Sequence, residues 1–349
     1  MKRTGSTTGS TTGGTTGSGV RALLAGALAS ALLGGCAQLP ATSAPAAGDR
    51  APLVVEPVQA TRVVAAASEV LRAGADPATG DPQALAARVT GPELDLRTAA
   101  RTVAAAGATP AATGGADDFE AITSVLPRSA QWPRWFATVS AGGADQLPSV
   151  VVFRSGSARE PFKVWATPSL LPGVSLPTLA APADGVAAVA VDEGTNLPMS
   201  PQEVADRYGD VLTRGADSEF AGQFAPDGYR SGVADSVARE RSSIEAGGGT
   251  FTQERTVLAD GVLGVRTRDG GALVVAGYRW STTLDGPPDG ISGRLDPVLA
   301  ALAGREQALG ASVVREEVVV FSVPPGEAGS GRTVAVVAAQ SGLVSAQAR

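Results

Sequence analysis

The sequence predicts an α+β fold of two tandem related modules, each with N-terminal helices packed on a curved antiparallel sheet. The first observation is a heptad that occurs twice, as "VLRAGAD" at 70–76 and "VLTRGAD" at 211–217. The second is a helix pattern around each copy, and the third is a series of strand-like segments after each helical region. The copies lie 141 residues apart (211 − 70) in a chain of 349 residues, which indicates an internal duplication.

The second copy ends a helix whose start is marked by capping residues. Ser200 is followed by Pro201 and by Glu203, which is the capping-box pattern with proline at the first helical position. Gly215 suits the left-handed conformation that ends many helices. The apolar positions in between recur with helical spacing: Val204, Tyr208, Val211 and Leu212.

The first copy has a matching pattern. Its helix is predicted to begin at Pro57 and to end at Gly74, with an apolar face of Val63, Ala67, Val70 and Leu71. The similarity continues into "LAARVTGPELDLR" at 85–97 and "FAGQFAPDGYR" at 220–230, each of which contains a proline followed by an acidic residue. A matched helix, cap, second helix and turn support the duplication.

Strand signals follow both helical regions. The second half contains candidate strands at 250–258, 261–269 and 271–284, joined by turns at Asp260-Gly261 and Asp269-Gly270-Gly271. The first half contains candidates at 134–140, 148–155 and 161–170, and two more lie at 312–325 and 332–340. Trp165 and Trp280 hold matching places in the third strands. They lie only 115 residues apart (280 − 165), so the first module is predicted to carry an extra loop at 104–118.

The N-terminus predicts a lipid anchor. Residues 22–33 form an apolar run of 12 residues after Arg21, which is too short to span a bilayer and typical of a signal peptide. The run ends in Leu33-Gly34-Gly35-Cys36, which resembles a bacterial lipobox, and Cys36 is the only cysteine. We therefore predict lipidation at Cys36 and anchoring on the extracytoplasmic face of the cell membrane, with membrane lipid as a partner. The alternative is an ordinary secretory signal with an incidental cysteine.

These signals divide the chain into four parts. They are a lipoprotein signal peptide at 1–35, a flexible tether at 36–55, a first module at 56–195 and a second module at 196–349. Residues 4–19 are an uncharged low-complexity stretch that fits no part of a signal peptide. One hypothesis is that translation starts at Val20 rather than at Met1.

Composition excludes several chemistries. The chain has no histidine, which excludes a Ser-His-Asp triad and any histidine-containing metal site, and its single cysteine excludes an intrachain disulfide. Removal of Lys2, Arg3 and Arg21 with the signal peptide changes the net charge from −6 to −9 (−6 − 3), which argues against nucleic acid as a partner. No glycine pattern supports a nucleotide site, since "AGGGT" at 246–250 is typical of a helix-to-strand break. We expect no cofactor and no metal.

The motif "RGADSEFAGQFAPDGYR" at 214–230, set between a helix and a sheet, resembles the nuclear-transport-factor-2-like (SnoaL-like) superfamily. Residues 200–284 match best and 57–170 match loosely. With "PRWFA" at 133–137 and the block "PFKVWA…LLPG" at 161–173, the whole chain also resembles a group of uncharacterised actinobacterial lipoproteins. The superfamily resemblance implies a cone-shaped pocket between helices and sheet, in which Asp, His or Tyr side chains act as acid and base.

The residues of this chain that would occupy such a pocket are Asp217, Glu219, Asp227, Tyr229 and Tyr278. The competing interpretation, which we favour, is that the aspartates are caps and turn formers and that the tyrosines are core residues.

Only one lysine remains after the signal peptide is removed, so a Ser-Lys dyad is the one nucleophilic arrangement available. Lys163 could pair with Ser155 or Ser157, but no spaced motif supports the pairing. A solvated strand lysine is the preferred interpretation.

The few aromatic residues could form an apolar ligand site. "WPRWF" at 132–136 is dense, and on a strand Trp132 and Phe136 would point to one face and Trp135 to the other. With Trp165, Trp280 and Tyr278 they are candidates for ligand binding, although a core role plus one surface tryptophan is the alternative.

The leading functional hypothesis is a non-catalytic envelope protein that binds a small apolar ligand or a protein partner. The first alternative is an enzyme of hydrolase or isomerase type that uses a carboxylate in a cone-shaped pocket. The second is a scaffold in which the two modules pack against each other.

Overall fold

The computed structural model describes residues 51–349, except 75, 78–79, 112–118, 142–146, 288–289, 291 and 328. The predicted signal peptide, Val20, the Leu33–Cys36 motif and most of the tether therefore lie outside the described residues. Residues Arg50–Arg349 make up one compact unit. Among the helices of the described ranges, none has the length and apolar character that crossing a bilayer requires.

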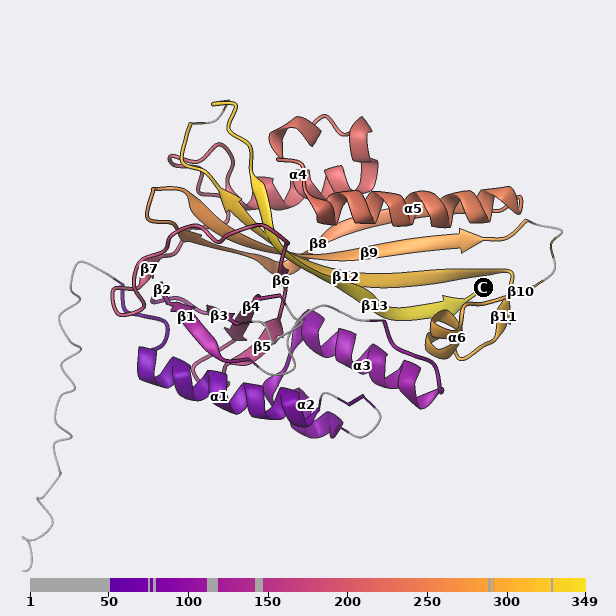
Figure 1. Ribbon diagram of the computed structural model, residues 1–349, viewed down its shortest axis with the longest axis horizontal. Coiled ribbons are helices and arrows are strands. Elements are labelled where there is room, and N and C mark those ends of the chain that lie inside the picture. The colour runs from indigo at the N-terminus through magenta and orange to yellow at the C-terminus, as the bar shows by residue number, and fades with distance from the viewer. Residues whose placement is uncertain are drawn as a thin grey trace, which may run out of the picture. The chain divides into compact units, whose positions relative to one another are not determined.

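One curled antiparallel sheet runs through the unit in the order β1-β3-β4-β6-β13-β12-β9-β8, and β5 pairs with β4 (Figure 1). Its nine strands are β1 (Ala121–Val125), β3 (Arg134–Ser140), β4 (Ser149–Ser155), β5 (Lys163–Ala166), β6 (Ser169–Leu170), β8 (Thr250–Arg266), β9 (Ala272–Asp285), β12 (Gly310–Val323) and β13 (Ala335–Ala348). Two short pairs lie outside it, β2 (Pro127–Arg128) with β7 (Val186–Ala187) and β10 (Gly293–Arg294) with β11 (Gln307–Ala308).

Helices cover both sides of this sheet (Figure 1). On one side lie α1 (Pro57–Ala73), α2 (Pro82–Arg88) and α3 (Gly91–Ala105), with the short α6 (Pro297–Ala303) against β13. On the other side lie α4 (Pro201–Arg214) and α5 (Gly228–Ala246), separated by the 3₁₀ turns η1 (Gly215–Asp217) and η2 (Ala221–Gln223). Helices packed on an antiparallel sheet are an α+β architecture, so the α+β part of the prediction is confirmed.

The strands of the two predicted modules belong to the same sheet. β6 pairs with β13 through Leu170 and Ala338, and the Trp165 ring packs so close to Gly277 that a Cβ there would lie 2.9 Å from it. The two halves therefore share one buried interior inside the curl of the sheet. The duplication remains a prediction, since the structure shows no second, separate module.

That interior is filled with apolar side chains from both halves. Val150 and Val152 of β4 meet Val275 of β9 and Val318 of β12 there. Residues at alternate positions of β9 and β12 point the other way, toward α4, as the two-residue period of a strand requires. The inside of the curl is thus a packed core rather than a cone-shaped cavity.

The helix starts lie where local chemistry predicts them. α1 begins at Pro57 and α4 at Pro201. In the capping box, the Ser200 hydroxyl accepts from the Glu203 amide at 3.3 Å, and the Glu203 carboxylate accepts from the Ser200 amide at 2.9 Å. Gly215 follows α4 with a φ of 62°, a value that favours glycine.

One predicted turn is wrong. Asp260-Gly261 does not join two strands, because β8 continues through it and pairs with β9 on either side, with a register shift between Val257 and Val262. Such a bulge bends a strand without ending it, and Asp260 adopts the positive φ that a bulge often needs. The other predicted turn, at Asp269-Gly270-Gly271, does connect β8 to β9.

Other predicted segments need smaller adjustments. The candidate strand at 161–170 is divided into β5 and β6, and the predicted loop at 104–118 begins where α3 ends, with 112–118 outside the described residues. Trp165 and Trp280 do not hold equivalent places, since Trp165 faces the interior of the curl and Trp280 faces the α4 side.

Candidate functional site

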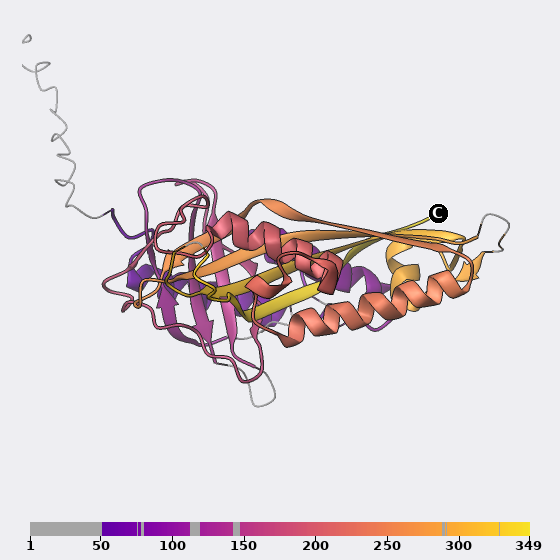
Figure 2. The same ribbon diagram turned by 90° about the horizontal axis from the view of Figure 1, so that it is seen from above.

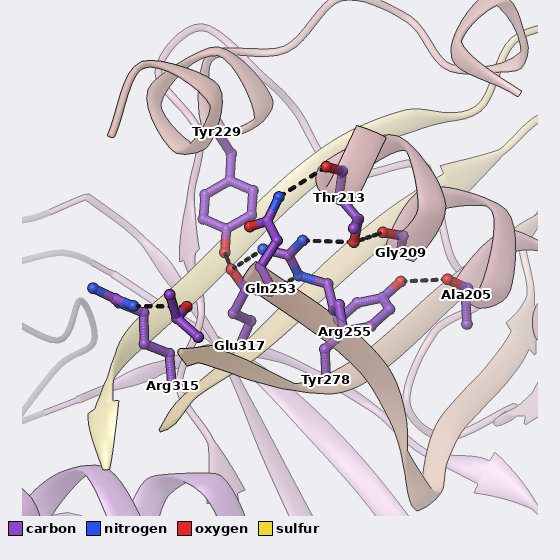
Figure 3. Close-up of polar contacts among 10 residues, drawn as sticks. Ala205, Gly209, Thr213, Tyr229, Gln253, Arg255, Tyr278, Arg315 and Glu317 are labelled. Atoms are coloured by element: carbon purple, nitrogen blue, oxygen red, sulfur yellow. Dashed lines mark hydrogen bonds and ion pairs between the residues drawn. The ribbon is translucent and has the colours of Figure 1, made fainter. Parts of the chain in front are cut away.

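The layer formed by α4 and α5 contains the polar and open features of the fold. α4 packs its apolar face on β9, β12 and β13, with Tyr208 set edge-on to Phe224 and Phe321 at centroid distances of 5.1 and 4.9 Å. The Tyr278 hydroxyl donates to the Ala205 carbonyl at 3.0 Å (Figure 3). This helix is therefore a structural part of the core.

A buried ion pair lies beneath the two helices. Arg255 of β8 and Glu317 of β12 approach to 2.6 Å, and neither side chain is exposed to solvent (Figure 3). Arg255 also donates to the Thr213 hydroxyl at 3.1 Å, which in turn donates to the Gly209 carbonyl at 2.8 Å. Hydrogen bonds of this kind are what makes a buried charge pair tolerable.

α5 reaches this pair through Tyr229. Its hydroxyl donates to Glu317 at 2.8 Å. Burial, followed by the nearby Glu317 carboxylate, raises the pKa of Tyr229 well above its ordinary value, and the same two causes raise the pKa of Tyr278. Both phenols therefore stay protonated and act as hydrogen-bond donors rather than as bases.

Trp280 lies between two arginines in the same layer. The guanidinium groups of Arg255 and Arg315 each lie 4.6 Å from its ring centroid, which is a cation–π distance. Arg315 also approaches Glu240 of α5 at 3.5 Å. Tyr229 and Glu240 are thus the two polar points at which α5 is held to the sheet.

Between these helices lies a groove of about 570 Å³, which we call the α4–α5 groove. Its walls are the end of α4, one face of α5 and Gln253 of β8. The α5 residues that line it recur with helical spacing. The apolar lining is Val211, Leu212, Ala234, Val237, Ala238 and Ala246, and the charged lining is Arg214, Arg230, Arg241 and Glu245.

The groove exists because α5 packs loosely on the sheet. Of its 19 residues only Val233 is buried. Figure 2 shows the helix running along the edge of the sheet beside α4. Gln253 forms part of the groove wall, where its amide nitrogen donates to the Thr213 carbonyl at 2.9 Å, while its buried amide oxygen accepts nothing from the described residues. That oxygen is shielded from solvent, so it lies behind the surface of the groove.

The arginines of the groove are weakly neutralised. Arg241 stacks over Phe251 at 4.8 Å and forms no ion pair with a described carboxylate. Arg214 approaches Asp210 only to 3.8 Å, and Arg230 approaches Asp227 only to 3.9 Å. In a chain of net charge −6, this groove is a local concentration of positive charge beside an apolar wall.

Some of the residues predicted from the sequence lie in this layer. Tyr229, Tyr278 and Trp280 surround the buried ion pair. Asp227 caps α5 by accepting from the Arg230 amide at 2.6 Å, and it also accepts from the Tyr208 hydroxyl at 3.1 Å. Its role in the structure is thus the cap that the competing interpretation assigned to it.

The remaining predicted residues lie elsewhere. Asp217 and Glu219 are exposed in the turns after α4. Trp135 and Trp165 lie in the interior of the curl, and Trp132 is 38% exposed at an edge of the unit. The structure therefore does not bring the tryptophans together into one aromatic site.

The serine and lysine candidates do not form a dyad. The Ser155 hydroxyl donates to the carbonyls of Ser157 and Glu160, and the Lys163 ammonium donates to the Ala86 carbonyl at 2.7 Å. Within the described ranges, no three Asp, Glu, Cys or His side chains are grouped as metal ligands would be.

Sequence reasoning missed Arg255, Glu317 and the groove arginines. One signal was present, because "VVREEVVVF" places two glutamates inside an apolar strand, where a buried carboxylate needs a partner. Its partner lies 62 residues away (317 − 255), so no local pattern could identify it.

Comparisons with known proteins cover most of the described chain. A family model described as Domain of unknown function (DUF8094) matches residues 55–347. An uncharacterized lipoprotein of Streptomyces avermitilis is 32% identical over 151 residues, which are 43% of this chain and 43% of that protein. No solved structure matches the chain, and the nuclear-transport-factor-2-like resemblance remains an expectation.

Proposed function

We propose a binding function for this chain, which belongs to the DUF8094 family: it is an exported lipoprotein, anchored through Cys36, that holds an amphipathic anion in the α4–α5 groove. The anchor is supported by the Leu33-Gly34-Gly35-Cys36 motif and by the lipoprotein name of the Streptomyces relative. A diacylglyceryl group on Cys36 supplies two acyl chains, which suffice for stable anchoring.

The observation that carries the binding proposal is the combination of an apolar wall with arginines that are only weakly neutralised. Ala234, Val237 and Ala238 offer a trench suited to an alkyl chain or another narrow apolar body. Arg241 and Arg214 offer guanidinium groups suited to a carboxylate, sulfate or phosphate. A ligand with both an apolar and an anionic part contacts both the apolar wall and the arginines, whereas a purely apolar ligand contacts only the wall.

The size of the groove agrees with this class of ligand. Small-molecule sites are typically clefts of about 300–1,000 Å³ lined mainly by apolar side chains with a few polar groups, and this groove measures about 570 Å³.

Binding is favoured over catalysis by the state of the buried polar groups. Glu317 is held by Arg255 and Tyr229, and both tyrosines of the layer stay protonated. A general base needs a free lone pair and a pKa near the working pH. The Arg255–Glu317 pair therefore serves to hold α4 and α5 on the sheet through Thr213 and Tyr229.

The proposal is tested by titration of the purified protein with a fluorescent long-chain fatty acid. Ala238→Trp fills the groove, so we expect it to abolish saturable binding, while Ser236→Trp on the exposed side of α5 is the matched control. Arg241→Ala removes a cation, so we expect about tenfold weaker binding, equivalent to ~1.4 kcal/mol. Its matched control is Arg239→Ala, which lies on the same helix outside the groove.

The ligand chemistry is tested with a fatty alcohol of the same chain length. Replacing the carboxylate of the ligand with a hydroxyl is expected to weaken its binding to the wild type but to change its affinity for Arg241→Ala little. Equal binding by the Ala238→Trp and Ser236→Trp proteins would show that the ligand site lies elsewhere.

A further inference from the structure

We infer that the folded unit rests against the lipid bilayer through the edge that carries Trp132, with the indole ring at the level of the headgroups. This edge consists of residues 51–54 and 127–134. The inference rests on the anchor part of the proposed function and is independent of ligand binding in the groove.

Trp132 differs from the other three tryptophans of the chain. It is 38% exposed, whereas Trp135, Trp165 and Trp280 are 8%, 5% and 4% exposed. The exposed part of an indole is costly in water, but it is favourable at a membrane interface, where one side of the ring is apolar and the N–H is hydrated.

The charge around this indole suits an anionic lipid surface. Arg134 lies over the Trp132 ring at 4.6 Å, and Arg128 precedes it by four residues. The segment from Pro127 to Arg134 contains no acidic residue. Basic residues are attracted to an anionic leaflet, so the edge combines an interfacial aromatic side chain with cationic groups.

The start of the folded chain is part of the same edge. Arg128 donates to the Ala51 carbonyl at 3.0 Å, the Ser129 amide donates to the Pro52 carbonyl at 3.0 Å, and the Val54 amide donates to the Pro127 carbonyl at 2.9 Å. In Figure 1 this start lies at the end of the unit that carries β2 and β7. The segment that arrives from Cys36 therefore enters the fold beside Trp132.

The distance to the anchor is limited by the chain. Fifteen residues separate Cys36 from Ala51 (51 − 36). Such a segment reaches about 54 Å when fully extended, and about 21 Å with the dimensions of a random coil. Of the surfaces of the unit, the edge where the chain enters is thus the one held closest to the lipid.

The experiment reconstitutes the mature protein into vesicles of phosphatidylglycerol and phosphatidylcholine. The phosphatidylcholine is brominated either near the headgroup or near the bilayer centre, and tryptophan emission is recorded. We expect quenching by the shallow bromines to exceed quenching by the deep ones. Trp132→Phe is expected to abolish the quenching, and as a change at an exposed site it should leave the fold intact.

A matched control places a tryptophan at the far end of the unit. Leu309 is 44% exposed, and its amide donates to the carbonyl of the C-terminal residue Arg349. Figure 1 shows the C-terminus at the end of the unit opposite β2 and β7. In the Trp132→Phe background, Leu309→Trp is expected to remain unquenched, and equal quenching there would overturn the inference.

Mass spectrometry of the Cys36 peptide shows whether a negative quenching result reflects a missing lipid anchor or a wrong inference about Trp132. Lipid on Cys36 with an unquenched Trp132 overturns the inference and leaves the anchor standing. Trp132 that is shielded from acrylamide but unquenched by bromolipid also overturns it, because a second protein copy then covers the edge. No lipid on Cys36 removes the anchor and this inference together, while binding in the groove is measured separately.

Discussion

α4 and α5 lie side by side on the same face of the sheet, yet they are packed in different ways. α4 has 14 residues, and its buried residues include Val204, Tyr208, Val211 and Leu212, whereas α5 has 19 residues and buries only Val233. The apolar residues of α4 recur on one face. The groove-facing side of α5 instead carries alanines and arginines.

The difference shows that a helix can be positioned while contributing few residues to the core. α5 is held at Asp227, Tyr229 and Glu240, through a cap, a hydrogen bond to Glu317 and an ion pair with Arg315. Between these points only Val233 is buried, and the side of α5 that faces the end of α4 lines the α4–α5 groove. We therefore expect the two helices to respond differently to substitution and to ligand.

The largest expected effect is that of truncating the central residue of each helix. Tyr208→Ala should lower the free energy of unfolding by about 3–5 kcal/mol, because it leaves a cavity among Phe224 and Phe321. Val233→Ala in α5 should cost only about 1–2 kcal/mol. Urea denaturation of both variants measures the two values, and similar losses would contradict the comparison.

Hydrogen exchange is expected to distinguish the helices without any substitution. Local opening needs less free energy where few apolar contacts are broken. The amides of α5 should therefore exchange at least about tenfold faster than those of α4, a difference of ~1.4 kcal/mol. A saturating fatty acid should slow exchange in α5 selectively, whereas equal slowing in both helices would point to a ligand site outside the groove.

A smaller effect is expected from the cap of α4. Ser200→Ala removes the acceptor for the Glu203 amide, so global stability should fall by about 1 kcal/mol. Ser200→Asp keeps a capping oxygen and is the matched control, with little loss expected. An unchanged midpoint for Ser200→Ala would indicate that α4 is not part of the cooperative unit.

The smallest expected effect on stability is that of replacing Glu316, which lies on the face of β12 opposite Glu317. It tests a site outside the layer formed by α4 and α5. Glu316 accepts from Arg279 at 2.7 Å, and burial, together with the Asp95 carboxylate, raises its pKa above the ordinary 4.5. The folded state then binds this proton more tightly than the unfolded state. Stability is therefore lost as pH rises from about 4.5 through the raised pKa.

Glu316→Gln should remove that loss. We expect a slightly higher melting temperature than the wild type at neutral pH and no advantage at pH values below the ordinary glutamate range. Fatty-acid binding should not change, because the substitution lies on the face away from the groove. A lower melting temperature at neutral pH would mean that the bond to Arg279 outweighs the cost of burial.

Much of the fold could be predicted because it depends on local chemistry. Proline at the first helical turn and the Ser200 capping box mark α1 and α4, since they satisfy or remove amides that a helix start leaves free. The short, mostly apolar segment 134–140 predicts β3, and its bounds match those observed. The Asp-Gly dipeptide at 260–261 was wrongly predicted to be a hairpin turn, because the same dipeptide suits both a hairpin turn and a bulge. Only the pairing of β8 with β9 on both sides of it decides between the two.

The candidate site was less predictable. Tyr229, Tyr278 and Trp280 were identified as chemically notable residues, but their partners were not. Glu316 and Glu317 are adjacent in the sequence and face opposite sides of β12, where they pair with Arg279 and Arg255. Which arginine meets which glutamate is set by the registers of β9 against β12 and of β8 against β9.

By itself the sequence determined the α+β class, the starts of the main helices, most strand segments and the absence of histidine and disulfide chemistry. These follow from hydrophobic period, capping and composition, which act over a few residues or over the whole chain. Only the tertiary structure decided that both halves share one curled sheet, that Arg255 meets Glu317 and that a groove lies between α4 and α5. Those features arise from contacts between distant segments, whose pairing no local pattern encodes.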